Sequence, residues 1–257
     1  MNTFHQIVWL GRRSLLFTLR QPVQIVPSIF FPLMFLVVIA AGGDRASTIP
    51  GFPAESYFAF ALGGAFVQGT MLSGVNSGSK LAYDIETGFL DRLVLTPVGS
   101  GSILIGHMIG SLAVSLIQLF TFLAAGLIGG VHIAAGVPGI LVMFALALAV
   151  SIAFSALGVI VGVRTGSSEA VQSAFPLFFI LLIFSSYMLP RNLMEADWFR
   201  WFATANPASY LIEGIRSLVI TGWDLGALAA GFGTAAGVAA LTLTGAAVSL
   251  RRKAVWS

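Results

Sequence analysis

Six long apolar segments, none with a charged residue near its centre, constrain the fold of this chain more than any other feature. A helix needs about 20 apolar residues to cross a bilayer, and each segment is close to that length. The chain is 57% hydrophobic and 9% charged, whereas soluble domains carry about 25% charged residues. The sequence therefore predicts an all-α membrane protein with six transmembrane helices, at about residues 23–41, 57–78, 103–128, 138–163, 170–189 and 225–250.

Several other classes of protein are excluded or disfavoured. The apolar segments are far longer than the strands of about 10 residues that build membrane β-barrels. There is no cysteine, so disulfides and thiolate chemistry are excluded. Without Asp, Glu, Lys or Arg near a span centre, ion-coupled transport is disfavoured. We predict no metal site and no catalytic residue, and we interpret His107, near one edge of its span, as a satisfied or snorkelling histidine rather than a proton relay.

The distribution of Lys and Arg over the loops predicts the orientation, because loops rich in these residues stay in the cytoplasm. With six spans and both termini in the cytoplasm, nine of the 13 Lys and Arg residues lie inside. These are Arg12, Arg13, Arg20, Lys80, Arg92, Arg164, Arg251, Arg252 and Lys253. The four on the outside are Arg45, Arg191, Arg200 and Arg216. This orientation places residues 83–97 in the cytoplasm.

Residues 2–21 predict an amphipathic helix that lies on the cytoplasmic surface of the membrane. Its apolar arc consists of Phe4, Ile7, Val8, Leu15 and Leu19. A positive-inside anchor with no further role is an equally good interpretation of this segment. Glycine pairs at four-residue spacing predict close approach between spans. These pairs are Gly74 and Gly78, Gly106 and Gly110, Gly158 and Gly162, and Gly233 and Gly237.

The segment 83–97 is the most polar stretch between two spans, with three acids and an arginine. Ile85, Phe89 and Leu93 recur every four residues and predict one apolar stripe on a short helix, which Thr96–Pro97 ends. An ordinary loop helix resting on the lipid is the alternative. The acids disfavour it, because cytoplasmic lipid surfaces are anionic and attract basic segments.

Residues 190–224 carry seven charges, too many for a lipid-exposed span, together with aromatic residues that favour the membrane interface. Asn206–Pro207 is typical of a helix start, because Asn can cap a helix and Pro suits its first turn. We predict a re-entrant hairpin of two short helices before the last span. Glu213 and Arg216 lie three residues apart on the second helix and are predicted to form an ion pair.

The order of these segments, with Thr96–Pro97 closing the acidic segment and Asn206–Pro207–x–x–Tyr210 in the re-entrant region, resembles the ABC-2 type transport permeases. The drug-resistance branch, typified by daunorubicin exporters, is the most similar. In one place the chain departs from the family, which often has Glu-Arg-Glu-x-Gly where residues 83–88 stand. The resemblance implies one transmembrane domain over residues 1–257 in the bacterial cytoplasmic membrane. It also implies a permease subunit that moves an amphipathic or hydrophobic compound, a drug or lipid, outward.

The resemblance assigns roles to three groups of residues. The coupling helix at 83–97 is expected to dock in a cleft of an ATPase subunit through Asp84, Ile85, Glu86, Gly88, Phe89, Asp91, Arg92 and Leu93. Two permease subunits are expected to meet at their first and fifth spans, with a substrate path lined by Phe30, Phe31, Phe35, Phe175, Phe178 and Phe179. The re-entrant motif consists of Asn206, Pro207, Tyr210, Glu213 and Arg216.

Partners and cofactors follow from what the sequence lacks. The chain has no phosphate loop of the form G-x-x-x-x-G-K-[ST], so ATP and Mg are expected on a separate ABC ATPase chain. The other expected partners are membrane lipid and a second permease subunit, a homodimer being favoured over a heterodimer. No nucleic acid partner is expected. Two alternatives remain open: a permease that exports a polysaccharide or lipid-linked glycan, and a membrane scaffold that transports nothing.

Overall fold

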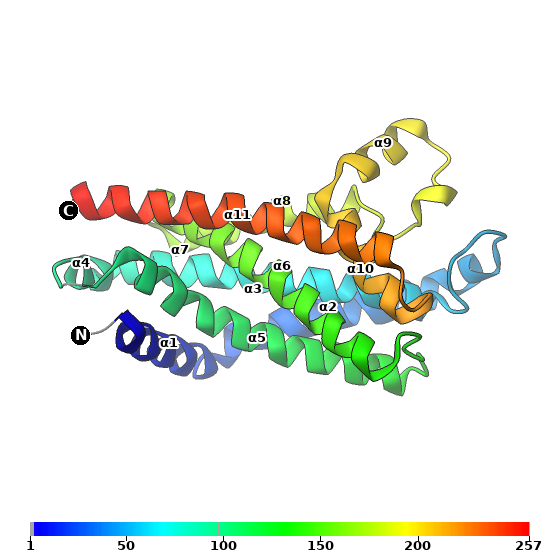
Figure 1. Ribbon diagram of the computed structural model, residues 1–257, viewed down its shortest axis with the longest axis horizontal. Helices are drawn as coiled ribbons and strands as arrows, with labels where there is room; N and C mark the ends of the chain where they lie inside the picture. Colours follow the sequence, from blue (N-terminus) through cyan, green and yellow to red (C-terminus); the bar gives the residue numbers. More distant parts are fainter. Residues whose placement is uncertain (1–2, 97, 257) are drawn as a thin grey trace.

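The computed structural model describes residues 3–96 and 98–256, without the side chains of residues 22–24, 44, 94, 175 and 254–256, and every regular element in that part is helical (Figure 1). The prediction of an all-α fold is confirmed. The α-helices are α1 (Thr3–Leu19), α2 (Pro22–Gly43), α3 (Tyr57–Glu86), α4 (Phe89–Val94), α5 (Ser100–Ile128), α6 (Gly136–Thr165), α7 (Ser168–Ser173), α8 (Phe175–Ile183), α9 (Asp197–Ala205), α10 (Pro207–Ile220) and α11 (Leu225–Trp256). Two short 3-10 helices are η1 (Asp44–Thr48) and η2 (Arg191–Leu193).

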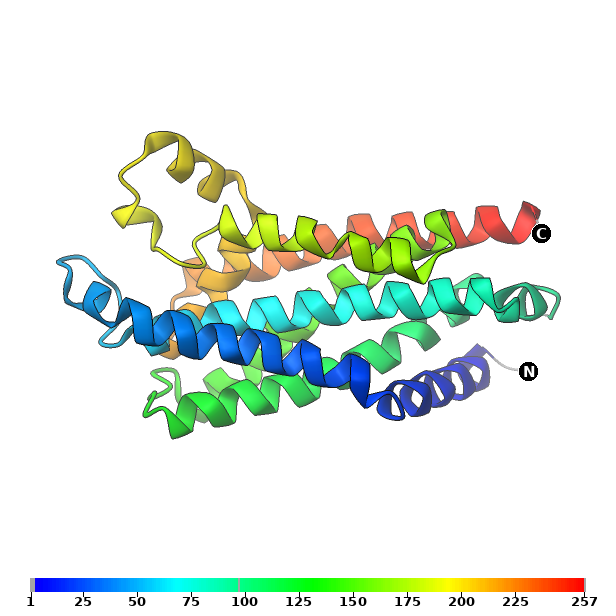
Figure 2. The same cartoon turned by 180° about the vertical axis from the view of Figure 1, so that it is seen from behind.

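Five helices in the described part of the chain are long and apolar enough to cross a membrane, and each overlaps a predicted span. They cover Ile25–Gly43, Tyr57–Glu86, Ser100–Ile128, Gly136–Thr165 and Leu225–Lys253. Figures 1 and 2 show them running along the long axis of the molecule. The helix α3 continues two turns beyond the predicted end at residue 78, because no helix-breaking residue follows until Gly88.

The prediction of one continuous helix over residues 170–189 is wrong. The helix α7 ends at Ser173 and α8 begins at Phe175. Ala174 between them is the C-cap residue of α7 and the N-cap residue of α8. Pro176 in the first turn of α8 has no N–H group and cannot continue the hydrogen-bond ladder of α7. The helix α8 then ends at Ile183, so the apolar helical stretch Ser168–Ile183 is shorter than the other five.

Small residues let α3 pack tightly inside the bundle, as the glycine spacing predicts. Gly74 and Gly78 lie directly against the backbone of α6 at Phe154 and Gly158, where a Cβ atom would collide. Gly162 lies in the same way against Gly78. Gly106 and Gly110 of α5 pack against α1 at Leu10 and Ser14. A Cβ atom at Gly233 or Gly237 would have no neighbour within 4 Å in the described part of the chain.

Buried serines join the same three helices. The hydroxyl oxygens of Ser73 in α3, Ser115 in α5 and Ser151 in α6 form a triangle. The Ser73 oxygen lies 2.7 Å from that of Ser115 and 3.1 Å from that of Ser151, and the last two oxygens are 2.7 Å apart. Each can donate to one neighbour and accept from another, so no hydroxyl is left unpaired in an apolar surrounding. Hydrogen bonds between helices hold membrane bundles together where the hydrophobic effect does not.

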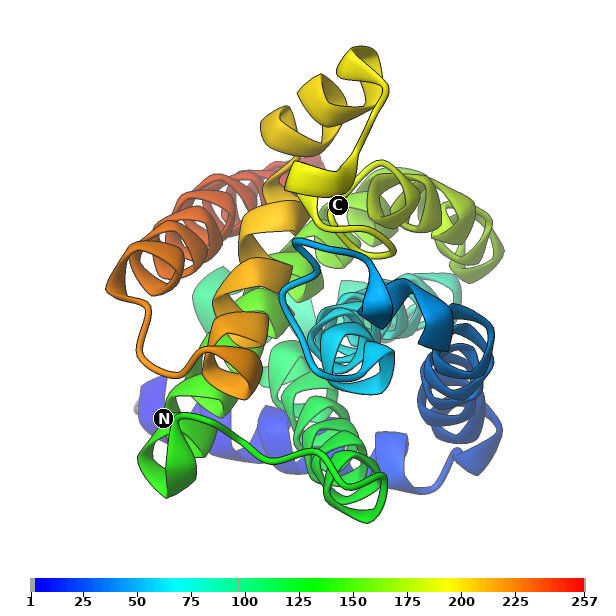
Figure 3. The same cartoon turned by 90° about the vertical axis from the view of Figure 1, so that its right-hand side faces the viewer.

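The bundle has two different ends. Both termini and α4 lie at one end, called the α4 end below, and η1 and α9 lie at the other, called the α9 end (Figure 1). The helix α10 packs against α3, α6 and α11. Figure 3 looks along the bundle from the α9 end, with α9 standing out from it. Residues 190–224 thus contain η2, α9 and α10.

Candidate functional site

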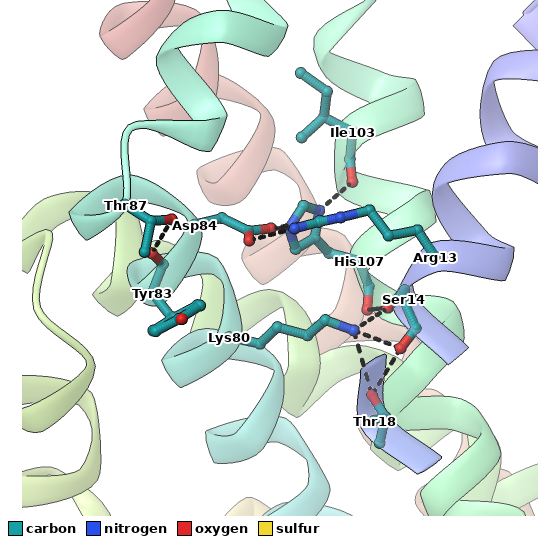
Figure 4. A network of polar contacts seen from close by, with 9 residues as sticks. All are labelled: Arg13, Ser14, Thr18, Lys80, Tyr83, Asp84, Thr87, Ile103 and His107. Carbon is teal, nitrogen blue, oxygen red and sulfur yellow. Dashed lines mark hydrogen bonds and ion pairs between the residues drawn. The ribbon is translucent and has the colours of Figure 1, made fainter. Parts of the chain in front are cut away.

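Four ionisable side chains gather at the α4 end of the bundle, where α1, α3 and α5 meet (Figure 4). They are Arg13 from α1, Lys80 and Asp84 one helical turn apart on α3, and His107 from α5. We call this group the polar cluster. Three of its members are buried, and Arg13 reaches the surface.

Asp84 is the centre of the polar cluster. Arg13 donates from Nη1 to Oδ2 at 2.8 Å and from Nη2 to Oδ1 at 2.7 Å, which makes a two-pronged ion pair. The Asp84 side chain is only 1% exposed, and that of Arg13 is 35% exposed. Bidentate pairs of this kind combine charge with a specific geometry. A lone buried carboxylate would be costly, so Arg13 makes the burial of Asp84 possible.

His107 completes the surroundings of Asp84. Its Nε2 lies 2.8 Å from Asp84 Oδ2, and its Nδ1 lies 3.0 Å from the carbonyl oxygen of Ile103. Each ring nitrogen therefore lies within hydrogen-bond distance of a partner in the chain. The interpretation of His107 as a satisfied histidine is confirmed.

Lys80 ties α3 to α1. Its Nζ donates to the carbonyl oxygen of Ser14 at 2.5 Å, to the Ser14 hydroxyl at 2.7 Å and to the Thr18 hydroxyl at 3.2 Å. The ammonium group has three hydrogens, and each has an acceptor here. The ring centroid of Phe17 lies 4.9 Å from Nζ and adds a cation–π contact.

A glycine turn connects the polar cluster to α4. Gly88 has a φ of 67°, in the left-handed region that favours glycine, and it reverses the chain between the end of α3 and the start of α4. Phe89, the first residue of α4, then lies over Arg13, with 3.7 Å between its ring centroid and Cζ. Arg13 is therefore held between Asp84 and Phe89, and α4 is attached to both α3 and α1.

The predicted stripe of Ile85, Phe89 and Leu93 on one helix is wrong. The turn at Gly88 places Ile85 on α3 and the other two on α4. Leu93 and Ile85 pack against a core cluster that contains Leu90, which is fully buried. Ile85 and Leu93 are therefore partly covered by this chain's own core, which leaves less of each side chain for a cleft of another protein.

Two of the three acids expected at the docking surface also have internal roles. Asp84 is inside the polar cluster. Glu86 accepts hydrogen bonds from the backbone N–H of Ser168, at 2.7 Å, and from its hydroxyl, which holds the first turn of α7 against the end of α3. Of the predicted coupling residues, Glu86, Asp91 and Arg92 are exposed, and of these Glu86 is hydrogen-bonded to Ser168.

The most exposed apolar side chain near α4 is one that the spacing argument missed. Leu95, at the end of α4, is 85% exposed. Together with Asp91 and Arg92 it forms an exposed surface that we call the α4 tip. The only sequence signal for Leu95 was its place just before Thr96–Pro97, out of register with the stripe. Pro97 itself lies outside the described residues.

The conformation of Gly88 gives a first testable prediction. Gly88→Ala should lower the free energy of unfolding by about 1 kcal/mol, because a Cβ atom disfavours the left-handed region while no other atom lies within 4 Å of it. Thermal unfolding of the purified chain in detergent measures the change. Gly101→Ala is the matched control, since Gly101 also has no neighbour within 4 Å but lies in the helix α5, where alanine is favoured. Equal effects of both substitutions would contradict the turn argument.

The aromatic residues predicted for the substrate path separate into groups. Phe31 and Phe35 of α2 lie 6.2 Å apart, and Phe179 of α8 lies 5.7 Å from Phe35 and 6.4 Å from Phe31. Phe178 instead packs against Phe154 of α6, at 5.8 Å. Phe30 is exposed on the outer side of α2. The side chain of Phe175 lies outside the described residues.

The Asn206–Pro207 motif starts α10 as the sequence predicts. The Asn206 side chain accepts a hydrogen bond from the Ala208 N–H, and Pro207 is the first helical residue. The Asn206 Nδ2 also donates to the carbonyl oxygens of Leu181 and Phe184 at the end of α8. The Tyr210 hydroxyl donates to the Thr204 carbonyl oxygen at 2.8 Å. Asn206 thus satisfies the ends of two helices at once.

The predicted ion pair of Glu213 with Arg216 is wrong. Glu213 pairs with Arg191 of η2, which also lies over the Tyr210 ring. Burial lowers the pKa of Arg191, but the Glu213 carboxylate more than offsets this and leaves the pKa above its usual value. Arg216 turns inward and donates to the carbonyl oxygens of Phe60, Ser186 and Tyr187. Glu213 therefore pairs with Arg191, 22 residues away in the sequence, because the Arg216 guanidinium already donates to buried carbonyl oxygens.

The comparison with known proteins agrees with this architecture. The sequence profile described as "ABC-2 type transporter" matches residues 5–220, from the first turn of α1 to the end of α10, and this range includes the whole polar cluster. The chain belongs to the ABC-2 type transporter family. The resemblance noted in the sequence is therefore confirmed.

Relatives come from bacteria and from algae. The daunorubicin resistance ABC transporter permease protein of Streptomyces coeruleorubidus is 30% identical over 215 residues, covering 80% of this chain and 72% of the relative. The probable doxorubicin resistance ABC transporter permease protein of Mycobacterium tuberculosis is 22% identical over 236 residues, covering 91% and 83%. A putative transport permease of Porphyra purpurea is 27% identical over 221 residues, covering 85% and 76%. All three relatives are named as permeases, which are transport components rather than enzymes.

Proposed function

We propose that this ABC-2 permease is the membrane subunit of an ATP-driven exporter that moves an amphipathic or hydrophobic compound, a drug or lipid, out across the bacterial cytoplasmic membrane. The family match carries the proposal. Two relatives are named for resistance to daunorubicin and doxorubicin, which favours planar amphipathic drugs as the first compounds to test. A separate ABC ATPase would hold ATP and Mg, since this chain has no phosphate loop.

The proposed topology has six crossings in a single domain over residues 1–257. The five long helices supply five of them, and α7 with α8 supplies the other in two pieces. The charged residues at the α4 end support a cytoplasmic position for it, because Arg13, Lys80 and Arg164 lie there with the C-terminal Arg251 and Arg252. In this arrangement α1 lies at the cytoplasmic surface, and η2, α9 and α10 form a re-entrant region on the opposite side.

The ATPase is proposed to bind the α4 tip. Leu95 gives that surface an exposed apolar side chain, and Asp91 and Arg92 give it charges of both signs. A displacement of α4 would reach α3 through the turn at Gly88. It would reach α1 through the contact of Phe89 with Arg13. The polar cluster thus joins the proposed docking surface to the centrally packed helix of the bundle.

A second copy of the chain is proposed to complete the substrate path. The outer face of α2 carries apolar side chains at helical spacing that no other described segment covers: Val26, Phe30, Met34 and Val37. The ring group of Phe31, Phe35 and Phe179 lies where α2 meets α8. Two chains that face each other through α2 and α8 would place these rings along a shared path. A homodimer is the simplest such arrangement.

Transport by the reconstituted complex tests the proposal. The chain is purified with a candidate ABC ATPase, and proteoliposomes are loaded with ATP and assayed for movement of daunorubicin. We expect drug-stimulated ATP hydrolysis and ATP-dependent transport, both lost when the catalytic glutamate of the ATPase is replaced by glutamine. Stimulation by a lipid-linked glycan instead of the drug would favour the glycan exporter. A stable complex with neither activity would favour the scaffold.

A further inference from the structure

A groove on the outer face of α1 combines positive charge with exposed apolar surface. Its volume is about 590 Å³. Three arginines line it, Arg12, Arg13 and Arg20, and Trp9 and Leu16 stand beside them on the same side of the helix. We call it the α1 groove. Of its residues, only Arg13 has a role proposed above, as a member of the polar cluster.

Two of the three arginines of the α1 groove are not neutralised by a carboxylate of the described chain. In the described part of the structure Arg12 and Arg20 have no carboxylate partner, and Arg12 contacts only the Trp9 ring, 5.6 Å from its centroid. Arg13 is paired with Asp84 but remains 35% exposed. Guanidinium groups hold phosphate through paired N–H donors. A phosphate between Arg12 and Arg20, which lie about two helical turns apart, would therefore meet two cations that have no carboxylate partner in the described chain.

The apolar side chains distinguish a lipid phosphate from a free one. Trp9 and Leu16 are exposed beside the arginines, and tryptophan favours the level of lipid head groups. A free phosphate ion would make no use of them, whereas the acyl chains of a phospholipid would cover both. At the end of the groove the Gln21 Oε1 is buried and has no hydrogen-bond partner in the described chain. A hydroxyl on the head group could donate to it.

We infer that the α1 groove binds the head group of one anionic phospholipid whose head group carries hydroxyls, such as phosphatidylglycerol. The phosphodiester lies between Arg12 and Arg20, and the acyl chains run along Trp9 and Leu16. Such a lipid would sit next to Arg13 and thus beside the polar cluster. The inference does not depend on transport, since it concerns only the chain and its membrane.

Native mass spectrometry of the full chain tests the α1 groove directly. The chain is released from micelles that contain equal amounts of phosphatidylglycerol and phosphatidylcholine, and the lipids that stay bound are identified. We expect one phosphatidylglycerol bound in preference to phosphatidylcholine. Arg12→Gln with Arg20→Gln should weaken its binding by about tenfold to thirtyfold, from the value of two basic residues at an anionic lipid surface. Circular dichroism checks that the variant folds.

A variant with the same loss of charge separates the groove from general attraction. Arg251→Gln with Arg252→Gln removes two arginines from α11 and should leave lipid retention unchanged. Equal loss in both double variants, or equal retention of both lipids by the wild type, would overturn the inference. Competition by inorganic phosphate at the same concentration would assign the site to free phosphate. A variant that keeps its lipid but no longer binds the ATPase would assign the groove to that protein.

Discussion

Leu95→Asp is expected to abolish coupling between this ABC-2 permease and the proposed ATPase subunit while leaving the permease folded. Leu95 is 85% exposed and makes few packing contacts within its own chain, so the substitution should change the free energy of unfolding by about 0.5 kcal/mol or less. An apolar side chain buried in a partner's cleft is worth roughly 2 kcal/mol or more when it anchors an interface. A carboxylate placed there would also lose its water. ATPase stimulation and transport should therefore fall by more than about thirtyfold.

A control at the other end of the bundle makes this result specific. Ile128, the last residue of α5, is 87% exposed and lies away from α4. Ile128→Asp makes the same chemical change at the same exposure and should leave both activities near those of the wild type. The measurements are ATP hydrolysis by the complex, transport, and the dissociation constant of the ATPase. Normal activity of Leu95→Asp would show that the ATPase does not use the α4 tip.

The spans could be predicted because the bilayer sets their length and composition. Hydropathy alone found the regions of all five long helices. The hydropathy argument ended the second span before α3 ends, because it stops at the first charged residue, Lys80. In the structure the Lys80 ammonium donates to three acceptors on α1, so this charge can be buried within α3, which continues to Glu86. Pro176 broke the expected fifth span for a local reason that average hydropathy does not register.

The candidate site was harder to predict, because its parts come from distant places in the chain. Arg13 and Asp84 are 71 residues apart, and His107 is 23 residues from Asp84. In the sequence Arg13 counted only as one more positive charge near the N-terminus. The stripe failed for a different reason: spacing by fours assumes one continuous helix, and the left-handed Gly88 interrupts it. Aspartates at Phe89 and Leu93, the change that the stripe suggests, would thus damage internal packing before they could test docking.

The buried ion pair gives the largest expected effect on stability. Asp84→Ala should lower the free energy of unfolding by about 3 kcal/mol, because breaking a buried pair leaves its partners without a counter-charge. Arg13 and His107 both lose their acceptor. For a chain of this size that corresponds to a fall of roughly 6–12 °C in Tm, measured by thermal unfolding in detergent. Asp197→Ala is the matched control. Asp197 is 95% exposed and its ion pair with Arg200 is long, at 3.7 Å. Exposed pairs of this kind contribute little to stability, so Tm should stay unchanged.

A double variant distinguishes the ion pair from packing alone. If the contact between Arg13 and Asp84 carries the effect, Arg13→Met combined with Asp84→Ala should cost clearly less than the two single changes added together, because residues in contact are coupled. Additive losses would mean that the contact with Arg13 does not carry the effect of Asp84. The same variants bear on mechanism, since Arg13 also holds Phe89 at the start of α4. Loss of coupling by Arg13→Met with Tm largely retained would place Arg13 in the path from α4 to the bundle.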